Sequence, residues 1–158
     1  MQTERMSKLR DFCGKMDAQG AELDMNVWAD FGSLFEIGPC RRGCVIGWAL
    51  IHQVFKTEGL VADSPTWRPL FGHYTGREAL EHFFGLGSEE VNRLFFPYHH
   101  PTREVTWQDK IASIDALIAA EHSRRARDEV QKLAALAEAA AKAAGGEREA
   151  MTEPATLV

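Results

Sequence analysis

The chain has 158 residues, of which 45% are hydrophobic and 26% charged, and its formal net charge is −5. This composition is typical of a folded domain and excludes a wholly disordered chain, and the length favours a single core. The negative charge argues against a general nucleic-acid binder, because affinity for phosphate backbones comes from clustered lysines and arginines.

The cysteines and the apolar runs indicate a cellular compartment. Cys13, Cys40 and Cys44 cannot all pair, and no charged leader followed by a long apolar stretch opens the chain. The longest apolar run, Val45 to Ile51, is too short to span a bilayer. We therefore expect a cytoplasmic protein with reduced thiols, no membrane contact and no cofactor.

The first half of the chain predicts two helices separated by a loop. Residues 1–18 carry apolar residues at spacings of three and four, which predicts one buried helix face formed by Met6, Leu9, Phe12, Cys13 and Met16. Residues 22–39 contain glycine and proline and are expected to form a packed loop. Residues 41–55 are apolar on nearly every side of a helical projection, which predicts a central helix surrounded by protein.

The second half predicts a long connection and three more helices. Residues 57–74 show few periodic signals and are expected to connect elements, with Trp67 and Phe71 as anchors. Two short helices follow: the first begins with a capping box from Thr75 to Glu78 and ends at Gly85, and Ser88 caps the second. A last helix begins at Thr106, with Asp109 completing its cap.

The end of the chain predicts a helical extension and a tail. Residues 121–144 are rich in helix formers, and apolar residues recur at alternating spacings of four and three: Val130, Leu133, Ala137, Ala140 and Ala144. Such a segment is either a solvated single helix or a coiled coil with a partner copy. The expected fold is all-α: a helical core domain over residues 1–120 around one buried central helix, the extension 121–144, and a disordered tail over 145–158.

Four stretches occur in an order found in a known family: LDMNVW, GCVIGWA, FFGLGSEEVNRLFFP and VTWQDKIASIDALI. Over about residues 22–120 the chain resembles small proteins of phage and bacterial mobile-element genomes that carry Phe/Leu-Asp-Met-x-x-Trp followed by Cys-Gly-Thr-x-x-Cys-Ile/Leu-Ala-Gly-His/Trp-Ala. Cys44, Gly47 and Trp48 match the second cysteine, the glycine and the His/Trp position. The chain has Pro39, Cys40 and Arg41 where the family has Cys-Gly-Thr. The resemblance implies a compact helical domain of phage origin and supplies no reaction.

The stretch PCRRGCVIGWAL, residues 39–50, carries the first candidate site. The amino end of a helix presents unpaired amides and partial positive charge, and two arginines add forked donors that suit phosphate. Aromatic side chains nearby would stack a base. The predicted ligand-binding residues are Arg41, Arg42, Gly43, Trp48, Tyr98, His99 and Arg103. In the alternative interpretation the arginines are solvated and the aromatic residues belong to the core.

Two other hypotheses use the cysteines. On one continuous helix Cys40, Cys44 and His52 share a face, and His99 or His100 would complete a tetrahedral zinc site. Alternatively, a Cys44 thiolate at the amino end of the helix, with a histidine as base, would serve as a nucleophile. Neither Cys-x-x-Cys nor His-Glu-x-x-His occurs in the sequence, and a buried Cys44 would simply be a small hydrophobic residue.

These features favour binding over catalysis. We expect an accessory protein in the cytoplasm of the host cell that counters host defence by sequestering a small anionic ligand, such as a signalling nucleotide, or by binding a host protein. A metal- or cysteine-dependent hydrolase is one alternative, and an inhibitor module that acts through residues 121–144 is another. Self-association through that segment stays open. Residues 124–127, RRAR, lie among acidic neighbours, so no sequence-specific nucleic-acid binding is expected.

Overall fold

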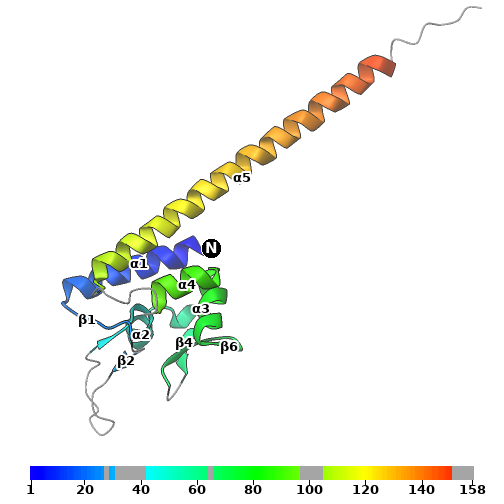
Figure 1. Ribbon diagram of the computed structural model, residues 1–158. Coiled ribbons are helices and arrows are strands. Elements are labelled where there is room, and N and C mark those ends of the chain that lie inside the picture. Colours follow the sequence, from blue (N-terminus) through cyan, green and yellow to red (C-terminus); the bar gives the residue numbers. More distant parts are fainter. Residues whose placement is uncertain (27–28, 31–41, 64–65, 97–104, 151–158) are drawn as a thin grey trace, which may run out of the picture. The chain divides into compact units, whose positions relative to one another are not determined.

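The computed structural model describes the backbone of residues 1–26, 29–30, 42–63, 66–96 and 105–150 (Figure 1). Within these ranges the chain forms five α-helices and one short 3-10 helix. They are α1 (Thr3–Ala18), α2 (Val45–Ile51), the 3-10 helix Lys56–Glu58, α3 (Gly76–Phe84), α4 (Ser88–Phe95) and α5 (Trp107–Ala150).

The described residues also form two small β-sheets, so the all-α prediction is wrong and the fold is mixed α and β. In the first sheet β1 (Glu22–Leu23) pairs in parallel with β3 (Arg42–Gly43), which pairs antiparallel with β2 (Ala29–Asp30). The second is an antiparallel meander of β4 (Leu60–Asp63), β5 (Arg68–Phe71) and β6 (Tyr74–Thr75). The predicted connection over residues 57–74 therefore contains strands β4 and β5 and the first residue of β6.

Strand length explains why the sequence did not predict these sheets. Strands of two to four residues are too short for an alternating polar and apolar pattern to be recognised. Pro69 also argues against a central strand, because proline cannot donate to a strand ladder. In the structure β5 lies between β4 and β6, but β6 pairs with Leu70 and Phe71 and does not reach Pro69. At Pro69 the strand β5 is therefore paired on one side, with Ala62 of β4.

The predicted central helix exists but is shorter than expected. The helix α2 covers Val45–Ile51 instead of residues 41–55, and Arg42 and Gly43 form a strand before it. After α2 the chain turns at Gln53, which has a left-handed φ of 53°. Glycine is the residue that usually marks such a turn, so the sequence gives no signal for the end of this helix.

The helical faces of α1, α3 and α4 confirm the sequence analysis. All five residues of the predicted face of α1 are buried, as are Leu80, Phe83 and Phe84 of α3 and Val91, Leu94 and Phe95 of α4. Edge-to-face contacts join the aromatic rings at the centre: Phe55 lies 5.1 Å from Phe83 and 5.6 Å from Phe84 between ring centroids. Gly85 ends α3 with a left-handed φ of 62°, as predicted.

The three predicted helix caps differ in outcome. Thr106 and Asp109 form the predicted cap of α5: the Asp109 carboxylate accepts from the Thr106 backbone N–H at 3.0 Å, and Thr106 Oγ1 accepts from the Asp109 N–H at 3.2 Å. Thr75 makes no side-chain cap bond. Ser88 is the first residue inside α4, whose cap is Gly87, and Glu90 accepts the Gly87 N–H at 2.8 Å.

The chain divides into two compact units, Met1–Ala119 and Ala120–Val158. The sheets, α1 to α4 and the first turns of α5 belong to the first unit. The described part of the second unit is helical up to Ala150, and the residues 151–158 of the predicted tail lie outside the described residues. No helix in the described ranges has the length and apolar character needed to cross a membrane.

We expect Thr106→Ala to lower the free energy of unfolding by about 1 kcal/mol, because it removes the hydroxyl of a formed cap. Ser88→Ala is the matched control and should change it by less than about 0.5 kcal/mol, because Ser88 is exposed and does not cap α4. Urea unfolding followed by circular dichroism measures both. Equal losses in the two variants would contradict the assignment of the caps.

Candidate functional site

The predicted anion-binding residues are only partly within the described chain. Four of the seven lie outside it: Arg41, Tyr98, His99 and Arg103. Arg42 lies on β3 with 46% of its side chain exposed, and its guanidinium pairs with the Asp24 carboxylate at 3.4 Å. Gly43 is buried in the same strand. Trp48 is 7% exposed and its Nε1 donates to the carbonyl of Glu22 at 2.9 Å, so its indole is packed in the core.

The amino end of α2 is enclosed by protein. Cys44 is the N-cap residue, and its Sγ accepts a hydrogen bond from the Gly47 N–H at 3.3 Å. Cys44, Val45 and Ile46 are each at most 1% exposed. Because the thiol takes one of the amides and the side chains around the end exclude solvent, this helix end does not offer its amides to a ligand.

The zinc hypothesis finds no support among the described residues. Cys40, His99 and His100 lie outside them. Cys44 is buried, whereas His52 is exposed and its ring packs 5.5 Å from Phe12 between centroids. In the ranges that the structure describes, no group of three or more His, Cys, Asp or Glu side chains is arranged to hold a metal ion.

Burial makes the two described thiols poor nucleophiles. Burial raises the pKa of Cys44 to about 11 and that of Cys13 to about 12. The nucleophile in cysteine catalysis is the thiolate, and reactive cysteines have a lowered pKa. At neutral pH both side chains are therefore protonated, which disfavours the hypothesis of Cys44 as a catalytic residue.

A buried lysine that the sequence analysis missed lies close to these thiols. Lys110 is 1% exposed, and its Nζ donates to the backbone carbonyls of Leu94 at 2.7 Å and Arg93 at 3.2 Å, in the last turn of α4. Burial lowers the pKa of Lys110 to about 8, and the negative charge of Asp109 opposes this shift. The ammonium thus binds α4 at its negative carboxyl end.

The spacing of Lys110 contains the signal that was overlooked. Trp107, Ile114 and Leu117 are buried residues of α5 at helical spacing, and Lys110 falls on the same face. A lysine within an apolar stripe needs a partner for its charge. The position thus indicates a buried polar contact, although the sequence could not identify the carbonyls that receive it.

The second unit presents the largest exposed apolar residues of the described chain. Val130, Leu133 and Leu136 of α5 are 67%, 61% and 58% exposed. The residues Ala126, Val130, Leu133, Ala137 and Ala140 lie on one side of the helix, and we call this set the apolar stripe. Every residue of the stripe is exposed. This surface contrasts with the first unit, where residues of the same types form the core.

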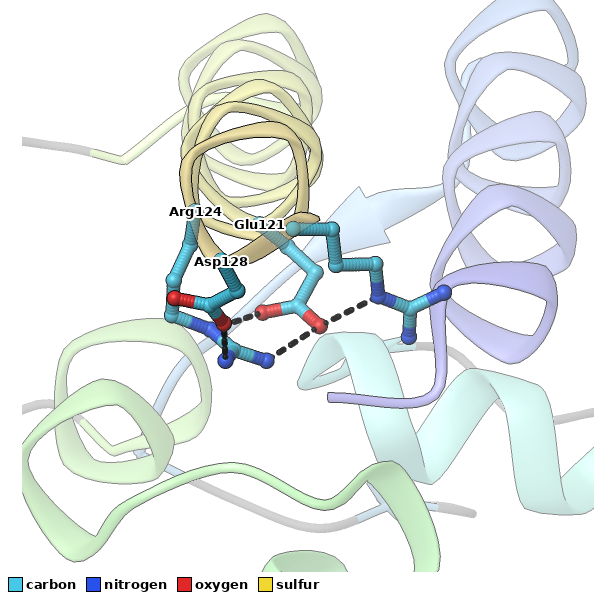
Figure 2. A network of polar contacts seen from close by, with 4 residues as sticks. Glu121, Arg124 and Asp128 are labelled. Carbon is cyan, nitrogen blue, oxygen red and sulfur yellow. Dashed lines mark hydrogen bonds and ion pairs between the residues drawn. The ribbon is translucent and has the colours of Figure 1, made fainter. Parts of the chain in front are cut away.

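Charged residues near the beginning of the same helix segment form a network of polar contacts (Figure 2). The Glu121 carboxylate accepts from Arg124 Nε at 3.0 Å and Nη2 at 2.9 Å, and from Arg125 Nε at 2.8 Å. Arg124 Nη1 also donates to Asp128 at 2.8 Å. The hydrogen bonds from Arg124 and Arg125 lower the pKa of Glu121 to about 2. These i,i+3 and i,i+4 contacts support the helix at the beginning of the second unit.

Comparisons with known proteins add no family to these observations. No family model, no curated protein and no solved structure matches this chain.

We expect native Cys13 and Cys44 to react with iodoacetamide at least about 100 times more slowly than a free thiol at pH 8, because each unit of raised pKa reduces the thiolate fraction about tenfold. In denaturant both should react at the rate of a free thiol. Mass spectrometry of the labelled peptides gives the rates. Rapid native labelling of Cys44 would instead support the cysteine-nucleophile hypothesis.

We expect the Glu121 carboxyl to titrate with a pKa of about 2 and Arg124→Gln to move it toward 4.5 by more than Arg125→Gln does, because Arg124 supplies two of the three hydrogen bonds. A lowered pKa stabilises the folded helix fully above about pH 4.5, and this contribution is lost as the pH falls through about 2. Carboxyl chemical shifts in NMR measure the titration. If the pKa of Glu121 were unchanged in Arg124→Gln, this result would contradict the contact between Arg124 and Glu121 that Figure 2 shows.

Proposed function

We propose that this chain is a small accessory protein that acts by binding another protein through residues 121–144, with the apolar stripe as the contact. One observation carries this proposal: Val130, Leu133 and Leu136 are more than half exposed on a single helix segment. Isolated exposed apolar residues are common on proteins. The stripe, however, repeats apolar residues at alternating spacings of four and three, which is typical of a helix that binds a partner.

The composition of the stripe indicates what kind of partner it fits. Three of its five residues are alanines, Ala126, Ala137 and Ala140, and short side chains allow a second helix to approach closely. The charged side chains of Glu121, Arg124, Arg125 and Asp128 bind one another away from the stripe. A partner helix with an apolar face would therefore cover the stripe without burying charge.

Binding through α5 is better supported than sequestration of a small anion. In the described part of the predicted anion site, Trp48 donates its N–H to a backbone carbonyl and Arg42 pairs with Asp24. Both side chains already have partners within the protein. The raised pKa values of Cys13 and Cys44 likewise favour binding over cysteine chemistry.

The proposal can be tested in cells with a photo-reactive amino acid placed on the full chain. We expect a benzophenone side chain in place of Leu133 to give a cross-linked product of defined mass after irradiation. The same side chain in place of Ala139 is the matched control, since Ala139 is exposed on the side of the helix away from the stripe, and should give none. No product from position 133, or equal products from both positions, would refute the proposal.

A further inference from the structure

We infer that the partner of the apolar stripe is the same stripe on a second copy of this chain, paired antiparallel so that Val130 and Leu133 of each copy lie against Ala140 and Ala137 of the other. The inference rests on the proposed function and names its partner. It follows from the order of large and small residues along the stripe and from the position of Leu136.

Side-chain size favours the antiparallel direction. The large residues Val130 and Leu133 precede the small residues Ala137 and Ala140. A parallel pair in register would place large residues against each other at one end of the stripe and alanines against each other at the other end. The large residues would hold the two helices apart, and this distance would leave gaps between the alanines. An antiparallel pair combines one large and one small residue in every such layer, which permits one uniform distance.

Leu136 has a place in the antiparallel pair. In this pair residue 133 of one copy faces residue 137 of the other, and residue 130 faces residue 140. The twofold axis therefore passes at the level of residue 135. Leu136 borders the stripe at one edge and lies next to this axis, so the two copies of Leu136 would meet across it. This contact would cover the third exposed large apolar residue of the described chain, which is 58% exposed in the single copy.

The first experiment measures the mass of the full chain by sedimentation equilibrium. With only two large residues per stripe, we expect a dimer with a dissociation constant on the order of 10 µM. Leu133→Asp should make the chain monomeric, whereas Ala139→Asp, which adds the same charge to the same helix away from the stripe, should leave the dimer intact. A wild-type chain that stays monomeric up to about 500 µM would overturn the inference.

The second experiment tests the direction. One chain carries Leu133→Cys and another Ala137→Cys, both with Cys40→Ser to remove a competing thiol, and the two are mixed and oxidised. We expect the disulfide to join position 133 of one chain to position 137 of the other, because these positions face each other only in the antiparallel pair. Disulfides formed mainly within each kind of chain would indicate a parallel pair and overturn the inference.

The two proposals can fail separately. A cross-link in cells from position 133 to a different protein, together with a monomeric purified chain, would refute self-pairing and leave the proposed function in place. Cross-linking of the chain to itself at position 133, together with a purified dimer that Leu133→Asp dissociates, would support both.

Discussion

Two indole N–H groups hold the first unit together at one point of the chain. Trp48 of α2 donates to the carbonyl of Glu22 at 2.9 Å, and Trp107 at the start of α5 donates to the carbonyl of Ala21 at 2.7 Å. Ala21 directly precedes β1 and Glu22 is its first residue, so helices far apart in the sequence are positioned on one short piece of backbone. Both indoles are buried, and these hydrogen bonds give each indole N–H an acceptor inside the protein.

The interior of the first unit also contains titratable side chains. Among them are Cys13, Cys44 and Lys110. Burial raises the pKa of the two thiols and lowers the pKa of the lysine, so in each case it favours the neutral form. The Lys110 ammonium is satisfied by backbone carbonyls of α4, and the Cys44 thiol caps α2. These groups therefore stabilise the unit, and the exposed apolar surface that our proposal uses lies on the second unit.

The candidate site could be predicted from the sequence to the extent that it depends on one helix. The stripe from Ala126 to Ala140 depends only on the periodicity of α5, which can be read from the sequence directly. The anion site predicted around Arg42 and Trp48 depended instead on where α2 begins. A helix beginning at residue 41 would have presented its amides beside both arginines, whereas a helix beginning at Val45 has its first turn inside the core.

The sequence alone determined the elements that local interactions stabilise: the buried face of α1, the cap between Thr106 and Asp109, and the periodic burial along α3, α4 and the start of α5. Only the tertiary structure decided the sheets and the ends of α2. The pairing of Glu22 with Arg42 joins residues twenty positions apart, and a strand of two residues forms only when its partner is already placed. Local propensity contains no information about that partner. Hydrogen bonds between distant segments therefore form strands where the residue pattern had predicted a loop or a helix.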